Sequence, residues 1–185
     1  MSFGLGFWAA AGSGEPPAFE QITTTILGSS TSSVSFDVTG LGSTYRHLQL
    51  RYLARTSQST PYGDVLLRFN SDSGSNYAWH QLRGNGSSVS SSASTSQAQI
   101  LLEATGNTAA SNNFGAAVTD ILDSFSTAKN TTVRVFIARA ESGDNGIFLK
   151  SGLWLNTAAL TNVSLTVPSA NFLTGSRFSL YGVKG

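Results

Sequence analysis

The sequence predicts an all-β domain, either a sandwich or a barrel. Eleven short segments have the composition of strands and are separated by clusters of Gly, Ser, Asn and Asp. Several of them alternate apolar and polar residues, as strands with one buried face do. Lys and Glu, which favour helices, are scarce, whereas the chain of 185 residues contains 29 Ser and 19 Thr. We therefore expect no long helix.

The expected strands follow one another at short intervals. In order, they cover residues 19–27, 33–38, 45–56, 64–70, 77–82, 98–104, 114–122, 131–140, 146–155, 162–167 and 176–184. Four strands show a clear apolar face, formed by Val34, Phe36 and Val38; Leu48, Leu50 and Tyr52; Val133, Val135 and Ile137; and Val163, Leu165 and Val167. These residues are the predicted core, and the polar residues between them are expected to face water.

The stretch 84–97, GNGSSVSSSASTSQ, is of low complexity and has almost no apolar content. Such a segment cannot contribute to a packed core. We expect it to form an exposed loop.

Two of the expected strands are apolar on both faces. Their residues are Val65, Leu66, Leu67 and Phe69 in the first, and Ile147, Phe148, Leu149, Leu153, Trp154 and Leu155 in the second. A second apolar face must be covered either within the domain or by another subunit. The sequence leaves both alternatives open.

Residues 1–18 are expected to form an extended N-terminal arm before the β domain of residues 19–185. The arm carries the apolar residues Phe3, Leu5, Phe7 and Trp8, followed by GSGEPP, which is typical of a hinge and a stiff spacer. It either binds another protein or folds back onto its own domain. We do not expect a cleaved secretory signal, because the first basic residue is Arg46.

Composition argues against several classes of partner. The net charge of +1 is too small to attract nucleic acid or an anionic membrane. No apolar run approaches the length of a transmembrane helix. The chain contains no cysteine, so a thiolate metal site and a cysteine nucleophile are excluded.

The residues that could carry chemistry do not form a convincing site. His47 and His80 have no neighbouring ligands, so no metal is expected. The segment 72–76, DSGSN, is typical of a turn and lacks the acidic ligands of a calcium loop. Asp120 and Asp123 are three apart and would point to opposite faces of a strand. We expect no catalytic residues, no cofactor and no enzymatic activity.

Tyr77 and Trp79 are two residues apart and share one face of their expected strand. An exposed pair of this kind could stack on sugar rings or contact a partner, but the pair could equally belong to the core. Both alternatives remain open at the level of sequence.

Seven segments along nearly the whole chain resemble the sequences of a known protein family. They are GFWAAAG, FEQITTTILGSSTSSVSFDV, YRHLQLRYLART, LLRFNSDSGSNYAWHQLRGNGSS, VTDILD, SGLWLNTAALTNVSLTV and RFSLYGVKG. Together they resemble a family of small virion structural proteins of tailed bacteriophages, described variously as capsid decoration, fibre or minor tail proteins. The connection VTGLGSTYRH departs from the family pattern, in which a proline usually precedes the tyrosine.

The resemblance implies a sandwich of jelly-roll type, assembly on a larger particle and no enzymatic residues. We therefore expect a capsid decoration or cement subunit in the virion, assembled in the bacterial host cytoplasm. Its partners would be the major capsid protein or tail and baseplate components, and it would form a homotrimer. The alternative is a tail or baseplate fibre subunit that recognises host glycans.

Overall fold

The structure, a computed structural model, describes residues 17–140 and 145–185. Within these ranges the chain forms twelve strands and one short 3-10 helix, η1 (Leu41–Ser43). The strands are β1 (Phe19–Ile26), β2 (Ser33–Asp37), β3 (His47–Ala54), β4 (Tyr62–Phe69), β5 (Tyr77–Gly84), β6 (Val89–Gln97), β7 (Ile100–Thr105), β8 (Gly115–Leu122), β9 (Thr131–Arg139), β10 (Gly146–Trp154), β11 (Asn162–Thr166) and β12 (Arg177–Val183). All eleven predicted strands occur, with ends that differ by no more than two residues.

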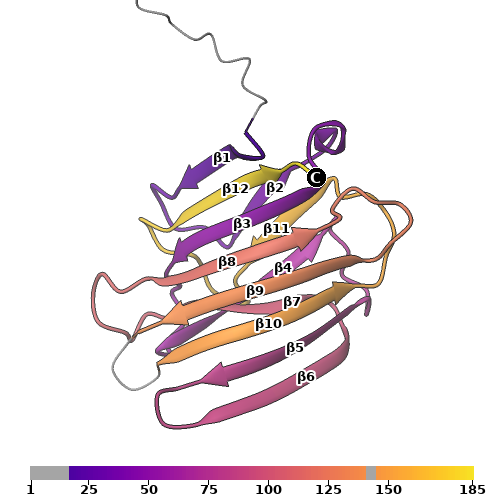
Figure 1. Ribbon diagram of the computed structural model, residues 1–185. Coiled ribbons are helices and arrows are strands. Elements are labelled where there is room, and N and C mark those ends of the chain that lie inside the picture. Colours follow the sequence, from indigo (N-terminus) through magenta and orange to yellow (C-terminus); the bar gives the residue numbers. More distant parts are fainter. Residues whose placement is uncertain (1–16, 141–144) are drawn as a thin grey trace, which may run out of the picture.

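The strands form two antiparallel sheets that pack face to face (Figure 1). The larger sheet has the order β1-β12-β3-β8-β9-β10-β5-β6, and the smaller has the order β2-β11-β4-β7. From β2 to β5 the chain changes sheet at every strand, and β8, β9 and β10 form a meander within the large sheet. This winding confirms the predicted sandwich of jelly-roll type. It disfavours a closed barrel, because within the described ranges each sheet ends in strands with a neighbour on one side only.

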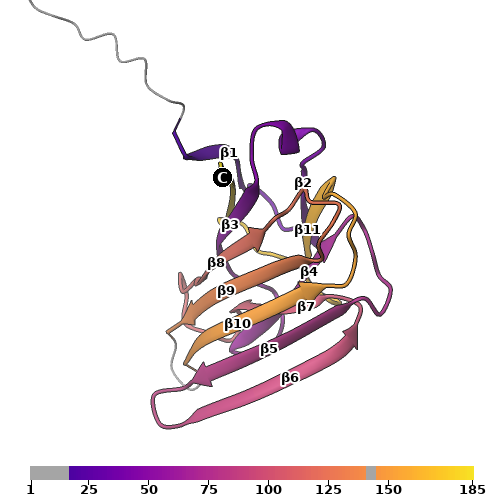
Figure 2. The ribbon, with the colours of Figure 1, turned by 45° about the vertical axis from the view of Figure 1, so that its right-hand side comes forward.

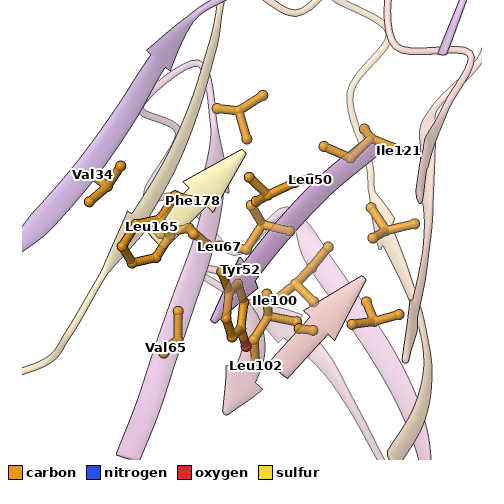
Figure 3. Close-up of a cluster of buried hydrophobic side chains, with 14 of the residues drawn as sticks. Val34, Leu50, Tyr52, Val65, Leu67, Ile100, Leu102, Ile121, Leu165 and Phe178 are labelled. Atoms are coloured by element: carbon orange, nitrogen blue, oxygen red, sulfur yellow. The ribbon is translucent and has the colours of Figure 1, made fainter. Parts of the chain in front are cut away.

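The core lies between the two sheets and is formed by alternate residues of the strands. Figure 3 shows Leu50, Tyr52 and Phe178 of the large sheet beside Leu67 and Ile100 of the small sheet. All twelve residues of the predicted core face are buried. The period-two pattern therefore identified the inward side of these strands correctly.

The serine-rich stretch corrects the sequence prediction. Residues 89–97 form β6, which pairs with β5 along the edge of the large sheet, although most of its side chains are exposed as expected. The connecting turn is stabilised by the Asn85 side chain, whose Oδ1 accepts hydrogen bonds from the backbone N–H groups of Ser87 and Ser88. Gly86 in this turn has a positive φ of 87°. The loop prediction was wrong because backbone pairing to β5 does not require apolar side chains.

Among the described residues, no helix is long and apolar enough to cross a membrane. The predicted arm residues Phe3, Leu5, Phe7 and Trp8 lie outside the described part of the chain.

Candidate partner interface

The outer face of the large sheet, turned away from the small sheet, carries several exposed large apolar side chains. No described segment lies over β8, β9, β10 and β5 on this side in either view of the ribbon (Figure 2). Strand alternation sends every second residue of these strands outward. The chemistry of the face is therefore set by the residues that the pairing register brings side by side.

A row of large apolar side chains crosses the middle of this face. Val118 of β8 lies opposite Phe136 of β9, Phe136 lies opposite Leu149 of β10, and Leu149 lies opposite Leu82 of β5. Directly paired residues on one face have their Cβ atoms about 4.5–5.5 Å apart, so these four form one continuous strip.

A second apolar row runs beside the first, one step along the strands. Its members, from β3 to β6, are Leu53, Ala116, Ala138, Ile147, Gly84 and Val89. We call the two rows together the outer apolar face. Its six largest exposed members, Leu53, Leu82, Val89, Phe136, Ile147 and Leu149, are each between 45% and 72% exposed.

A polar row borders the apolar strip on its other side. It contains Gln49, Asp120, Arg134, Ser151 and His80, again in direct register from β3 to β5. Asp120 accepts a hydrogen bond from Gln49 Nε2 at 2.7 Å and forms an ion pair with Arg134 Nη2 at 3.2 Å. The border is therefore a preorganised line of donors and acceptors at the surface.

A shallow groove of about 670 Å³ lies along the boundary between the apolar strip and the polar row. Leu82, Phe136 and Leu149 form its apolar floor, and Asp120 and Arg134 stand at its polar side. Contiguous exposed apolar patches rimmed by polar residues mark interaction sites. The arrangement fits binding of a partner surface.

The inner face of the same strands holds a buried ionic cluster that joins the two sheets. Glu103 of β7 accepts from Arg139 Nη2 of β9 at 2.9 Å, and its other oxygen lies 3.6 Å from Lys150 Nζ of β10. Lys150 Nζ also donates to the carbonyl of Leu101 at 3.0 Å. Burial lowers the pKa of Lys150, although the Glu103 carboxylate opposes that shift. The cluster fixes the position of β9 and β10 beneath the outer apolar face.

Tyr77 and Trp79 do not form an exposed aromatic platform. Tyr77 is fully buried, and its hydroxyl accepts a hydrogen bond from the backbone N–H of Phe69 at 3.0 Å. Trp79 is half-buried against the core, with Lys150 Nζ 5.7 Å from its ring centre. The core alternative therefore holds for Tyr77, which is not accessible to a glycan or a partner.

The two histidines occupy separate surface positions. His47 Nδ1 accepts a hydrogen bond from the backbone N–H of Asp123 at 2.8 Å, whereas His80 lies in the polar row described above. Asp123 also pairs with Arg46 and Lys129, each at 2.8 Å, and hydrogen bonds from these two cations lower the pKa of its carboxyl to about 2. Within residues 17–140 and 145–185, no group of three or more metal-ligating side chains could hold an ion.

The segment 72–76 is a turn stabilised by its own side chains. One carboxylate oxygen of Asp72 accepts from the backbone N–H of Gly74 at 2.8 Å. The other accepts from Asn76 Nδ2 at 2.9 Å and from the indole N–H of Trp154 at 2.7 Å. These donors occupy the oxygens that a cation would need, and they lower the pKa of Asp72.

Sequence reasoning found part of the outer apolar face and missed the rest. It identified Ile147 and Leu149 as members of a second apolar face, and the described structure leaves both exposed. It missed Phe136 and Leu82, although each is an apolar residue at an outward position of an alternating strand. Both residues could have been found from the alternation of inward and outward positions along their strands.

No family model, curated protein or solved structure matches this chain. The fold and the site together define a jelly-roll β-sandwich with an apolar sheet face that residues 17–140 and 145–185 leave uncovered. Its function is argued from that face.

Proposed function

We propose that this chain is a non-enzymatic structural subunit of a bacteriophage virion that decorates or cements the capsid. The observation that carries the proposal is the outer apolar face, which the described part of the chain leaves uncovered. A protein with such a face is suited to assembly with other proteins. The resemblance to phage virion proteins supports the virion as the place of assembly.

Covering the outer apolar face would be strongly favourable. Fully burying a Val, Leu, Ile or Phe side chain is worth roughly 1.5–3 kcal/mol, so covering the exposed halves of six such residues would contribute on the order of 1 kcal/mol each. Phe136 and Leu149 lie at the centre of the strip, where partner contacts exclude water best. A single well-fitted partner surface can therefore be held without any charged steering.

The arm supplies the second element of the proposal. Phe3, Leu5, Phe7 and Trp8 would insert into a neighbouring virion protein, with the aromatic residues as the main contributors to binding. The spacer GSGEPP would then hold the β-sandwich above the attachment point.

The test is the copy number in purified particles, measured by quantitative gel densitometry against the major capsid protein. Decoration predicts one copy per capsid protein or a simple fraction of that number. A handful of copies per particle would overturn the decoration role in favour of the fibre alternative. Absence from the particle would overturn the virion assignment altogether.

A matched pair of variants tests the arm. The double substitution Phe7→Ser with Trp8→Ser should abolish incorporation while leaving the circular dichroism of the isolated protein unchanged. The control is Ser13→Ala in the spacer, which should be incorporated normally. Normal incorporation of the double variant would overturn anchoring through the arm.

A further inference from the structure

We infer that the outer apolar face binds the same face of a second copy of this chain, about a two-fold axis that runs along the strands between β9 and β10. This inference names the partner of that face, and in this sense it rests on the proposed assembly role. It replaces the homotrimer expected from the sequence with a dimer.

The axis follows from the symmetry of the register. Two sheets that pack face to face keep their strands within about 30° of each other, so an in-plane two-fold axis along the strand direction is compatible with sheet packing. With this axis between β9 and β10, β9 covers the partner's β10, β8 covers the partner's β5, and β3 covers the partner's β6. Such a contact is isologous, so each pair of facing residues occurs twice.

Over the four central strands, apolar side chains then face apolar side chains, and at the ends of the central row Arg51 faces the partner's Ser91. In the central row, Phe136 lies over the partner's Leu149, and Val118 lies over the partner's Leu82. In the second row, the small side chain of Ala138 lies over the partner's Ile147. At the end of that row Leu53 meets the partner's Val89, so two exposed apolar residues from distant strands cover each other.

The polar row is matched by the same operation. Asp120 faces the partner's His80, whose imidazole N–H can donate to the carboxylate, and Arg134 faces the partner's Ser151 hydroxyl. A two-fold axis perpendicular to the strands, along the central row, would instead place Arg134 over the partner's Ala138. Charged groups left against apolar surface are costly, so the register favours the axis along the strands.

The area is sufficient for a specific contact. The contact spans six strands spaced about 4.8 Å apart and three rows of outward residues spaced about 6.8 Å apart along the strands. In flat projection this is on the order of 600 Å² on each subunit. Accessible area exceeds this projection because side chains stand out from the sheet. The total of about 1,200 Å² is already at the lower end of specific interfaces.

The oligomeric state of the full chain tests the inference. Sedimentation equilibrium should find a dimer, and Leu149→Lys should convert it to a folded monomer, because the lysine would face the partner's Phe136. The control is Ile26→Lys on β1, beyond the partner's edge, where the isoleucine is 64% exposed against 55% for Leu149. A monomeric or trimeric wild type, or a Leu149→Lys variant that remains dimeric, would overturn the inference.

Cross-linking tests the register, because the chain has no cysteine of its own. Leu53→Cys and Val89→Cys variants, mixed and treated with a bis-maleimide of about 10 Å span, should give a cross-linked heterodimer. A linker is needed because packed sheets lie about 10 Å apart, farther than a disulfide can reach. Neither variant alone should cross-link, because Leu53 and the partner's Leu53 are about five strand spacings, or roughly 24 Å, apart. Cross-linking of either variant alone would overturn this axis.

The arm is the competing occupant of the outer apolar face. If the arm of one copy covered the face of another, Phe7→Ser with Trp8→Ser would abolish the dimer as Leu149→Lys does, and the inference would fail. A dimer that persists in this arm variant supports direct contact between sheets. The two proposals also fail separately: normal particles containing a monomeric protein would overturn only the dimer, and a dimer absent from particles would overturn only the virion role.

Discussion

The two faces of β10 reverse the usual distribution of side chains. The inner face contains Lys150, whose amino group is buried between the sheets, together with the buried ring of Phe148. The outer face presents Ile147 and Leu149, both 55% exposed. On most half-buried strands the charge would face water and the leucine would face the core.

The difference shows that a side chain of β10 is buried where it has interaction partners inside the protein, whether it is charged or apolar. Lys150 is accepted in the interior because Glu103, the Leu101 carbonyl and aromatic rings compensate for lost hydration. Leu149 remains outside because no described segment of the chain covers it. The inner face is covered by the described residues of one chain, whereas none of these residues covers the outer face.

The largest expected effect comes from breaking the inner cluster. Glu103→Gln should lower the free energy of unfolding by about 3–5 kcal/mol, because Arg139 and Lys150 would face a neutral amide in a buried site. The measurement is urea unfolding followed by circular dichroism. At dilutions where the monomer predominates, Asp120→Asn, which alters an ion pair at the surface, is the control and should cost no more than about 1 kcal/mol. Equal losses in the two variants would refute the contrast between the faces.

A second prediction compares neighbouring residues on the two faces. Phe148→Ala should cost about 3–5 kcal/mol, because it leaves a cavity between the sheets. Leu149→Ala should change stability by only about 0.5 kcal/mol when measured at dilutions where the monomer predominates. At higher concentration the Leu149 variant should lose more, since it also weakens the dimer. A concentration-independent loss for Leu149→Ala would argue against the proposed contact.

A third, smaller effect concerns the end of the inner face of β10. Asp72→Ala should cost about 1–3 kcal/mol, because the indole N–H of buried Trp154 loses its acceptor. Asp72→Asn retains one carbonyl oxygen and should lose less. Urea unfolding monitored by tryptophan fluorescence checks both values. If Asp72→Ala were as stable as the parent, the turn would not support the inner face.

The smallest effect is on the titration of two carboxyls, one beside the inner cluster and one at the surface. Burial raises the pKa of Asp64, although nearby Lys150 opposes the shift, whereas hydrogen bonds from Lys129 and Arg46 lower that of Asp123 to about 2. Asp64 therefore favours the folded state at low pH, and its contribution is lost as pH rises through its folded pKa. The stabilisation from Asp123 is present above its unfolded pKa and is lost as pH falls toward 2.

Carboxyl titrations by nuclear magnetic resonance check these directions. Asp64 should titrate above the usual range for aspartate and Asp123 below it. Lys129→Ala should raise the pKa of Asp123 and leave that of Asp64 unchanged. Equal pKa values for Asp64 and Asp123, or a lower value for Asp64, would contradict the contrast in their surroundings.

Alternation predicted most of the fold because the core strands follow it closely. Val34, Leu50 and Leu165 were placed in the core from their spacing alone, and all are buried. The strand β6 could not be found in this way, since it is held by backbone pairing to β5 and its serines give no apolar phase. Local composition does not report an edge strand whose stability comes from its neighbour.

The candidate interface was predictable only in part. Ile147 and Leu149 were visible as surplus apolar residues, but their alignment with Phe136 and Leu82 depends on the register of four strands. The sequence does not state that register, because residues far apart in the chain set it. The burial of Lys150 could have been predicted locally, since it lies two residues from the buried Phe148 and therefore on the same face of β10.

The pairing of β1 with β12 has a consequence for synthesis. Residues 19–26 contact residues 177–183 across the edge of the large sheet, and β12 also separates β1 from β3. During synthesis on the ribosome, β1 therefore has no strand to pair with until β12, near the end of the domain, has been synthesised. Because this closing contact spans nearly the whole domain, β1 should be among the last strands to dock and the first to depend on chaperones.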